Sequence, residues 1–423
     1  MKDYRVTRIP NFLEFIRVAC PVCGHTGGCM IHTDGDRVVC IRIESKIPFS
    51  KNSSLPSWLH FLNGNKRHPG INDNNIEQNR GNKKLADSEL NKVYSIMLDY
   101  LELTDEHYNH LTSPSRGLTD EEVMTRGYTS FPAAPWTLAK AIQNDYGIES
   151  FAGVPGFFEA TGKYGDYWSV LGREGILIPY RNNRNEITGF QYRIDNPPPV
   201  AKIKQLTGVY GLKATNNGNQ VKVFYEKELI FEKEMQLNET VSLEDSKGKT
   251  LGFVSLKKGN RYYWLSSANK KNGTGAGSPS PVHVAVPSRT LKNWQSGQSL
   301  YRKKIWLTEG ALKADIAVDM LQRSFTQEQL AKHGDTFAAI PGVNAWQTVI
   351  PIFEDMGVEE INLAFDRDFT SNEYVMSSLK EFLVTTKQKG YHVNMVSWGK
   401  DDGKGIDDLL LTGSKIPKIT RIF

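Results

Sequence analysis

The chain has 423 residues, of which 39% are hydrophobic and 23% are charged, a globular composition that leaves room for two or three domains. No apolar stretch approaches the roughly 20 residues that a membrane helix needs, and the first residues, MKDYRVTRIPNFLEF, lack the apolar block of a signal peptide, so we expect a soluble, cytoplasmic protein with no membrane partner. The formal net charge of +5 is compatible with a polyanionic partner but too small to indicate one.

The 4 cysteines all lie in one short stretch, CPVCGHTGGCMIHTDGDRVVC, which is unlike a disulfide framework and typical of a local metal knuckle. The candidate ligands are Cys20, Cys23, Cys29 and Cys40. Four thiolates are the set that a closed, tetrahedral zinc site needs. His25 or His32 could replace Cys29, and the alternative for the whole group is four buried, reduced cysteines. Residues 1–62 would struggle to fold without a metal, which favours structural Zn²⁺.

Residues 63–87 are rich in Asn, Gly and charge and almost free of large apolar side chains, so we interpret them as a flexible linker. A region from 88 to 300 follows and opens with helices. Its first helix is predicted from apolar residues at helical spacing, namely Val93, Ile96, Met97, Tyr100 and Leu101. In GLTDEEVMTRG, Thr119 and Glu122 form a capping box that predicts a second, short helix.

From about residue 172 the apolar period changes to two. The stretch GILIPYRNNRNEITGFQYRID alternates around an Asn-rich turn and predicts a β-hairpin. Further β-like runs between about 220 and 267 predict a small antiparallel sheet inserted into this region, which is therefore α+β.

The last region, residues 301–423, alternates strand and helix. The predicted strands are KKIWLTEG, TFAAIPG, EINLAFDRD and HVNMVSW, with helices between them. Repeated βα units of this length indicate a mostly parallel, Rossmann-like sheet with helices on its faces. Functional side chains then belong at the carboxyl ends of the strands.

Two of these strands end in acidic residues. The strand IWLTE ends in Glu309, and the apolar run INLAF is followed by Asp366 and Asp368, which would project together if the strand continued through them. Three uncompensated carboxylates at one sheet edge would repel each other, whereas Mg²⁺ and Mn²⁺ accept such oxygen ligands. For each acid alone the alternatives are a solvated loop, or a favourable charge at a helix N-terminus.

A glutamate after the first strand and an Asp-x-Asp after a later strand resemble the Toprim domain of bacterial-type primases, topoisomerases and some nucleases. The four-cysteine knuckle followed by PSWLHFL, together with LTSPSRGLTDEEVMTRGY and VPGFF, is similar to DnaG-like primases of phages, plasmids and mobile elements. The cysteine spacing differs from that of the cellular primases, and no helicase-binding C-terminal domain is recognisable.

This resemblance implies an N-terminal zinc ribbon, an α+β primase core and a C-terminal Toprim domain. It implies template-directed synthesis of short RNA primers on single-stranded DNA from nucleoside triphosphates, with Mg²⁺ or Mn²⁺ held by the catalytic acids. A replicative helicase or a single-strand binding protein would be further partners. The implied catalytic and metal-binding acids are Glu309, Asp366 and Asp368, with Asp407 or Asp408 of GKGIDDLLLTG as a further acid.

Basic residues near these motifs are candidates for contacts with nucleotides and strands. Lys313, one turn beyond Glu309, either reaches a phosphate or neutralises the acids. The candidate strand-binding residues are Arg116, Arg181, Arg193, Lys202 and Lys204. The alternative for each is an ordinary solvated surface charge.

Two other functions fit the same pattern. A nuclease could use the same acids and metal, and a non-catalytic protein could initiate replication by occupying single strands. A topoisomerase is the weakest alternative, because no tyrosine stands in a context that suggests a strand-transfer nucleophile. Synthesis of labelled RNA, shortening of the template, or retention without turnover distinguishes the first three.

Overall fold

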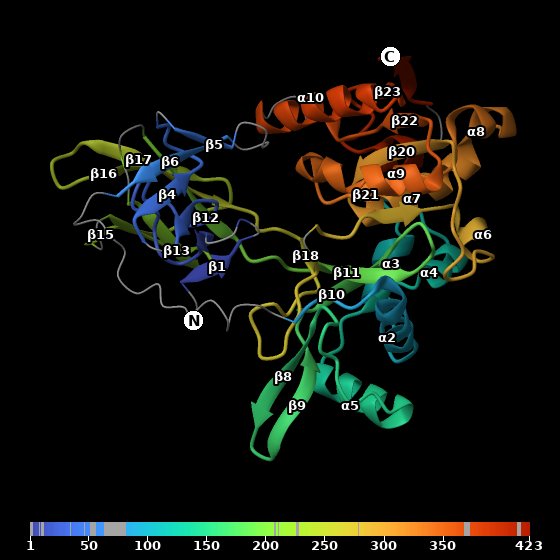
Figure 1. The fold of residues 1–423 in the computed structure, drawn as a ribbon, viewed down its shortest axis with the longest axis horizontal. Coiled ribbons are helices and arrows are strands. Elements are labelled where there is room, and N and C mark those ends of the chain that lie inside the picture. Colours follow the sequence, from blue (N-terminus) through green and yellow to red (C-terminus); the bar gives the residue numbers. More distant parts are fainter. Residues whose placement is uncertain are drawn as a thin grey trace. The chain divides into compact units, whose positions relative to one another are not determined.

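The computed structural model describes residues 3–7, 9, 12–33, 35–45, 47–50, 56–62, 82–206, 209, 211–225, 228–277, 279–367, 373–412 and 416–423. By its contacts the chain divides into two compact units. The first joins Met1–Arg80 to Asn196–Arg261, and the second joins Gly81–Asp195 to Tyr262–Phe423. Figure 1 labels the elements of both. Of the predicted linker, residues 63–81 lie outside the described part of the chain, and its last residue, Asp87, begins a helix.

The N-terminal part of the first unit is a small antiparallel sheet in the order β1-β2-β3-β4-β6-β5. Its strands are β1 (Tyr4–Val6), β2 (Phe12–Phe15), β3 (Met30–His32), β4 (Arg37–Cys40), β5 (Pro48–Ser50) and β6 (Ser57–Phe61). Its core contains the four cysteines beside Phe15, Ile31 and Val38, all of which are buried. A core of this size buries little apolar area, so a metal held by the four cysteines would add to the stability of the sheet.

Residues 196–261 form two three-stranded antiparallel sheets, β12-β17-β16 and β13-β14-β15. The strands are β12 (Val200–Gln205), β13 (Lys213–Asn217), β14 (Gln220–Tyr225), β15 (Glu228–Glu234), β16 (Thr240–Glu244) and β17 (Thr250–Lys257). One apolar core, with Val221, Leu243 and Val254, lies between the two sheets. The sequence predicts a single small sheet here. The structure has two, because β12 and β13 precede the predicted insertion and supply the additional pairings.

The second unit begins with helices packed on an antiparallel sheet, β18-β11-β10-β7. The elements are α2 (Asp87–Asp99), α3 (Asp105–Thr112), α4 (Asp120–Arg126), β7 (Thr129–Ser130), α5 (Pro135–Tyr146), β10 (Gly175–Arg181), β11 (Ile187–Ile194) and β18 (Tyr262–Trp264). A separate hairpin consists of β8 (Phe157–Gly162) and β9 (Gly165–Val170). The predicted capping box at Thr119 and Glu122 is confirmed, as is the predicted hairpin, β10–β11.

The C-terminal sheet has the order β19-β21-β20-β22-β23-β24. Its strands are β19 (His283–Ala285), β20 (Lys304–Glu309), β21 (Phe337–Ile340), β22 (Glu360–Leu363), β23 (His392–Ser397) and β24 (Lys418–Arg421). The four central strands are parallel, and both edge strands run antiparallel to them. The four strands predicted from the sequence are therefore confirmed. β21 and β22 lie on opposite sides of β20, so the connections after β20 and β22 lead to opposite sides of the sheet. Open α/β sheets form their crevice at such a change in strand order.

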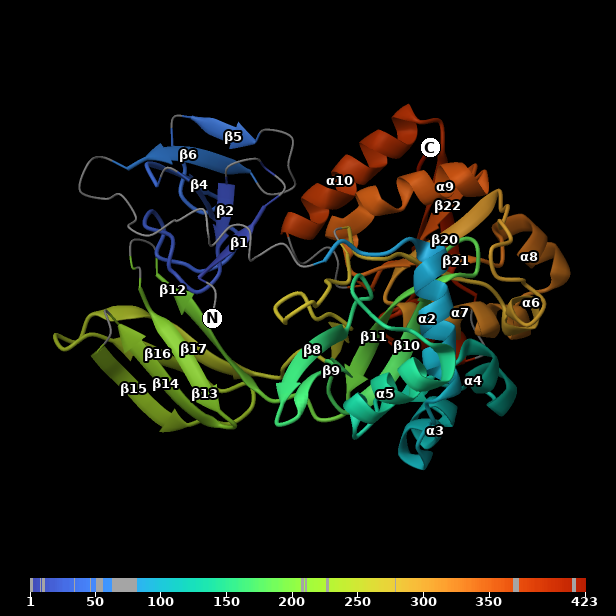
Figure 2. The same cartoon turned by 60° about the horizontal axis from the view of Figure 1, so that its bottom comes forward.

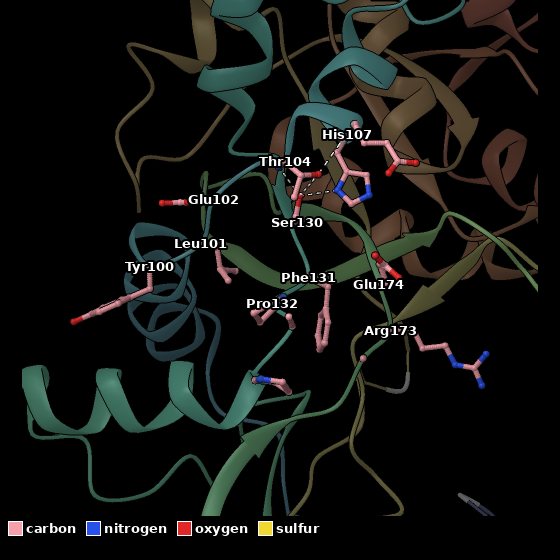
Figure 3. Close-up of a pocket in the computed structure, with 14 residues that line it drawn as sticks. Tyr100, Leu101, Glu102, Thr104, His107, Ser130, Phe131, Pro132, Arg173 and Glu174 are labelled. Carbon is pink, nitrogen blue, oxygen red and sulfur yellow. Dashed lines mark hydrogen bonds between the residues drawn. The ribbon is translucent and has the colours of Figure 1, made fainter.

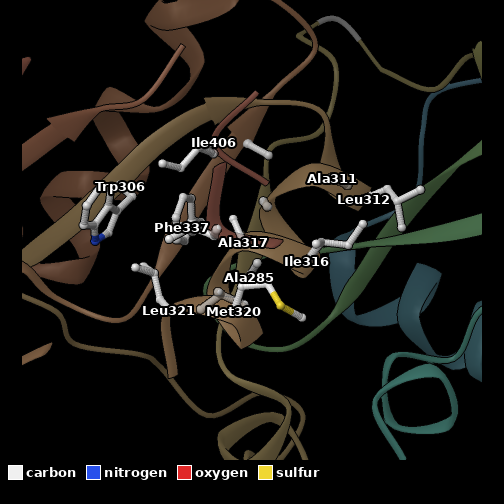
Figure 4. Close-up of a cluster of buried hydrophobic side chains, with 14 of the residues drawn as sticks. Ala285, Trp306, Ala311, Leu312, Ile316, Ala317, Met320, Leu321, Phe337 and Ile406 are labelled. Atoms are coloured by element: carbon white, nitrogen blue, oxygen red, sulfur yellow. The ribbon is translucent and has the colours of Figure 1, made fainter. Parts of the chain in front are cut away.

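Helices cover both faces of this sheet. They are α6 (Ser288–Leu291), α7 (Ala311–Ser324), α8 (Gln327–His333), α9 (Ile350–Met356), α10 (Glu373–Gln388) and α11 (Ile406–Leu411), with a 3₁₀ helix at Val343–Thr348. Alternate residues of β20 point to opposite faces: Trp306 joins the core beneath α7 and α11, shown in Figure 4, while Leu307 joins the core beneath α9 and α10. This two-sided burial explains the nearly continuous apolar runs of the strands.

Asp366 is not part of a strand, contrary to the predicted alternation of side chains through Asp366 and Asp368. The strand β22 ends at Leu363, and after the bond from Ala364 N–H to Leu307 O the chain leaves the sheet. Arg367 N–H then bonds to Lys404 O, in the loop after β23. Asp368 lies outside the described residues.

Candidate active site and metal centres

The four cysteine sulfurs of the first unit gather at one point. All four residues are buried, and their Sγ atoms lie within 4.8 Å of one another. The Cys23–Cys29 pair is separated by 3.6 Å and the Cys29–Cys40 pair by 3.7 Å. Zinc–sulfur bonds of about 2.3 Å place the sulfurs of a tetrahedral site about 3.8 Å apart. The geometry and the thiolate donor set therefore fit a structural Zn²⁺.

Backbone and side-chain donors around the cluster favour the thiolate form. The N–H groups of Arg42 and Ile43 lie 3.4 and 3.3 Å from Cys40 Sγ, and the Arg42 guanidinium lies 3.4 Å from Cys29 Sγ. Hydrogen bonds among the four thiols lower the pKa of Cys23 and bring the pKa of Cys40 to about 6, while the pKa values of Cys20 and Cys29 are raised. Positive charge and N–H groups at thiolate ligands offset part of their negative charge.

Neither histidine of the knuckle belongs to the group of residues whose ligand atoms lie within 4.8 Å of one another. His25 Nε2 is 3.2 Å from the Gln205 side-chain amide, and the His32 ring packs edge-on against Phe12 with ring centroids 5.1 Å apart. Cys29 occupies the fourth position instead.

The second candidate site lies where β20 and β22 end side by side. Glu309 is the last residue of β20, and Asp366 follows β22 by three residues. Gly310 has φ +80°, a value that favours glycine, and it turns the chain sharply from β20 into α7. The Glu309 carboxylate accepts a hydrogen bond of 3.1 Å from Val343 N–H. Glu309 and Asp366 thus both lie at the carboxyl ends of adjacent parallel strands, where open α/β sheets form their crevice.

Lysines compensate the charge of Asp366. Lys313, in the first turn of α7, donates to Asp366 Oδ1, and the Lys404 ammonium lies 3.5 Å from Asp366 Oδ2. The Lys313 and Asp366 side chains are only 18% and 15% exposed, so solvent screens this pair incompletely. Lys313 is among the residues predicted for this site, whereas Lys404, which belongs to GKGIDDLLLTG, is not.

Asp407 and Asp408 begin α11 and have different environments. Asp407 is 4% exposed, and the part of the chain that the structure describes offers its Oδ1 no hydrogen-bond partner. Burial raises the pKa of Asp407 to about 6, opposed by the nearby Lys313 and Arg116. Asp408 Oδ2 instead accepts hydrogen bonds of 2.9 Å from the N–H groups of Lys404 and Gly405. Asp407 therefore belongs to the acidic site, and Asp408 holds the turn before α11.

The acidic side chains suit a hard cation in their chemistry. Mg²⁺ and Mn²⁺ prefer carboxylate oxygens, which Glu309, Asp366 and Asp407 supply. One of these oxygens, Asp407 Oδ1, has no hydrogen-bond partner among the described residues. Among the described residues, however, the four cysteines are the only group of three or more ligands whose donor atoms lie close enough to share an ion. The acids therefore offer suitable donor atoms for a divalent cation, and in this structure Lys313 and Lys404 contact Asp366.

The predicted strand-binding residues divide between the two units. Arg116 lies beside the acidic site, 3.8 Å from Asp407 Oδ2. Arg193 is buried on β11 and lies 3.6 Å from Asp195. Arg181 donates to Asn185, and burial lowers the Arg181 pKa to about 10. Lys202 and Lys204 are exposed on β12 of the first unit. Arg193 is therefore a core residue and Arg181 is half-buried, whereas the two lysines are accessible.

A buried polar network behind the acidic site is not apparent from the sequence. Arg126, at the end of α4, donates to Asp315 and to Asp319 on α7. Tyr128 donates to Asp315 Oδ2 at 2.7 Å, and His283 Nε2 lies 3.0 Å from Asp315 Oδ1. The network attaches the helix that carries Lys313 to the preceding α+β part of the same unit.

A separate cavity of about 780 Å³ lies between α3, β7 and the loop before β10. Figure 3 shows Tyr100, Phe131 and Pro132 on its apolar side and His107 and Ser130 at its inner end. His107 Nδ1 lies 2.6 Å from Ser130 Oγ, and His107 Nε2 lies 2.9 Å from Asp195. Both ring nitrogens are thus satisfied, and Ser130 Oγ also accepts from Thr104 N–H. These hydrogen bonds connect α3, β7 and the residue that follows β11. They also occupy the polar atoms of His107 and Ser130 that line the cavity.

Within the described ranges, no helix is both long enough and apolar enough to cross a membrane.

A family model described as a domain of unknown function, DUF3854, matches residues 294–416, which include α7 and the four parallel strands. None of the curated proteins matches the chain.

The chain is also similar to solved structures of bacterial primases. The zinc-binding and RNA polymerase domains of the Aquifex aeolicus primase show 10% identity and a TM-score of 0.43, with 98% of this chain and 80% of that chain covered. The RNA polymerase domain of Mycobacterium tuberculosis primase DnaG shows 14% identity and a TM-score of 0.39, covering 77% and 80%. A DnaG primase catalytic domain bound to single-stranded DNA shows 11% identity and a TM-score of 0.40, covering 77% and 75%. Values this low describe a similarity and do not assign the chain to a family.

Proposed function

We propose that the chain is a DNA primase that joins ribonucleotides into short primers on a single-stranded DNA template. The observation that carries the proposal is the placement of Glu309 and Asp366 at the carboxyl ends of two adjacent parallel strands, β20 and β22. The connections that follow these two strands lead to opposite sides of the sheet, the arrangement at which open α/β sheets form their crevice. Two acids and a lysine in such a crevice are suited to hold a charged phosphate group and its cation.

In this proposal Glu309, Asp366 and Asp368 would hold Mg²⁺ or Mn²⁺, which neutralises charge on the reacting phosphates. Lys313 and Lys404 supply fixed positive charge next to Asp366. They limit repulsion between the acids when no phosphate is bound. Arg116 adds a further cation beside Asp407. The residues of the chain therefore position the reactants and balance charge, which is most of what nucleotidyl transfer needs from a protein.

The cysteine cluster supports the same proposal through its position in the chain. A zinc-stabilised sheet in the first unit can contact the template without taking part in the chemistry. We propose that it influences where synthesis starts. A phage or mobile-element origin and cooperation with a helicase or a single-strand binding protein remain predictions from the resemblance.

The test is incubation of the full chain with single-stranded DNA, labelled ribonucleoside triphosphates and Mg²⁺ or Mn²⁺. We expect short RNA products, and we expect Glu309→Gln and Asp366→Asn to abolish them while template binding is retained. Glu359→Gln is the matched control, because Glu359 precedes the opposite end of β22 and is 61% exposed. Shortening of the template would indicate a nuclease instead, and binding without turnover would indicate a non-catalytic protein.

A further inference from the structure

The charged residues of the 196–261 domain are distributed unevenly over its strands. Strands β12, β13 and β17 together carry four lysines and no acid, whereas β15 alone carries three glutamates. The lysines of the first group are Lys202, Lys204, Lys213 and Lys257. The domain thus has one basic region and one acidic strand.

Ion pairs strengthen this contrast. On the β14–β15 side, Lys222 pairs with Glu232 at 2.9 Å, and Lys233 pairs with Glu239 at 2.6 Å. None of the ion pairs among the described residues includes a lysine of β12, β13 or β17. Unpaired lysines in this number are available to phosphates without first breaking an internal pair.

An aromatic ring lies within the basic region. Phe253 of β17 is 36% exposed and points outward, and its cross-strand partners are Lys204 on β12 and Ser242 on β16. Two residues further along β17, Ser255 has Lys202 and Thr240 as its cross-strand partners. Two residues further again, Lys257 lies opposite Val200. We name this outward surface of the β12-β17-β16 sheet the lysine–phenylalanine face; Figure 2 shows its strands side by side.

From Phe253 to Lys257 the residues of this face alternate with buried ones. Val254 and Leu256 of β17 point into the domain core, while Phe253 and Lys257 point outward. An outward Phe therefore does not serve the core of the domain. Exposed aromatic rings on a sheet beside lysines are the arrangement on which bases stack while phosphates follow the cations.

We propose that the lysine–phenylalanine face binds single-stranded nucleic acid, with a base stacked on Phe253 and phosphates held by Lys202, Lys204 and Lys257. Duplex nucleic acid does not fit this role, because its bases are already stacked within the helix. The binding site is separate from the acids of the second unit, and the proposal does not depend on nucleotidyl transfer. Within the first unit, β12 ends at Gln205, whose amide reaches His25 of the cysteine knuckle.

The test uses the full chain and a fluorescent oligothymidylate, with anisotropy measured over a series of salt concentrations. Lys204→Gln is compared with Lys222→Gln, which removes the same charge from a paired lysine on the other sheet. We expect Lys204→Gln to weaken binding and to lower the salt slope by about 0.7, as for the loss of one phosphate contact. Lys222→Gln should change neither quantity. Equal effects of the two variants would overturn the proposal, because binding would then follow total charge.

Phe253→Leu tests the stacking contact, because leucine retains apolar bulk on an exposed strand and lacks a π face. We expect binding to weaken by roughly 5- to 10-fold with an unchanged salt slope. Circular dichroism of the variant shows whether the β domain is retained. A Phe253→Leu protein that is folded and binds oligothymidylate like the wild type, or a wild type that binds duplex equally well, would contradict the proposed face. Because Asp366→Asn is assayed for synthesis and these variants for binding, each proposal can fail separately.

Discussion

Lys313 donates a hydrogen bond to Asp366 across the crevice between β20 and β22. Both side chains are mostly buried, and Asp407 lies close enough for Lys313 to affect its pKa. The lysine therefore acts as a resident counterion of the acidic site. This relationship favours the neutralising role over direct binding of a phosphate.

Removal of this counterion should strengthen the binding of a divalent ion. In Lys313→Met the acids lose a competing positive charge, so we expect Mn²⁺ to bind more tightly, as measured by electron paramagnetic resonance. Lys404→Met, whose ammonium is 62% exposed, should have a smaller effect. If Mn²⁺ affinity stays constant while the KM for nucleotides rises, Lys313 binds a phosphate instead.

Asp407 should make the protein less stable as the pH rises. Its pKa is raised from 3.8 to about 6 by burial, so the folded state binds the proton more tightly than the unfolded state does. The stability that this group contributes is fully present below about pH 4 and is lost as the pH rises through about 6. A rise of this size corresponds to about 3 kcal/mol.

Asp407→Asn should therefore raise the free energy of unfolding at pH 7 to 8, by up to about 3 kcal/mol, and reduce its decline between pH 4 and 6. Asp408→Asn is the contrasting control, because Asp408 accepts two backbone hydrogen bonds at the start of α11. We expect that variant to lose about 1 kcal/mol. Urea unfolding over a pH series measures both, and destabilisation by Asp407→Asn at pH 8 would show that a partner satisfies the Asp407 carboxylate.

Removing Arg126 alone from the buried network should lower the free energy of unfolding strongly. Arg126→Met leaves the Asp315 and Asp319 carboxylates buried with less compensation, so we expect a loss of about 3–5 kcal/mol in the free energy of unfolding. The double variant Arg126→Met with Asp319→Asn should recover part of this loss, because one buried charge is removed. An equal loss in both variants would show that packing, and not charge, dominates at this position.

The zinc prediction can be tested by metal content. We expect one Zn²⁺ per chain after purification, its loss in Cys29→Ser and its retention in His25→Ala, measured by mass spectrometry of the metal. The reason is that Cys29 Sγ lies 3.6 Å from Cys23 Sγ, whereas the His25 ring is directed to Gln205. Retention of zinc by Cys29→Ser with loss in His25→Ala would reverse this assignment.

Local patterns in the sequence predict much of the fold. The buried apolar runs identify β20 to β23, and Thr119 with Glu122 identifies the start of α4, because these signals arise within a few residues of each other. The cysteine cluster is predictable for the same reason. The placement of Glu309 and Asp366 at one edge of the sheet follows from the parallel order of the strands, although Asp366 lies beyond its strand.

Contacts between distant parts of the chain are not predictable in this way. Arg126 and Asp319 are 193 residues apart, and a lone arginine near the end of a short helix resembles a solvated charge. Arg193 similarly reads as a surface cation on a hairpin but is buried in the structure. The alternation of side chains identifies β14, β15 and β17 as strands. It does not show that β17 belongs to a different sheet from β14 and β15, so the second sheet of the 196–261 domain is missed.

The pairing of β11 with β18 has a consequence for how this chain can vary. The chain leaves the second unit after Asp195 and re-enters it at Tyr262, and Arg193 and Tyr262 are direct antiparallel neighbours. Residues 196–261 thus occupy the place of a hairpin turn, and their two ends are already held together by the sheet. A short turn in their place would preserve the pairing of β11 with β18, so this domain can be exchanged, lost or acquired as a cassette while the second unit is inherited unchanged.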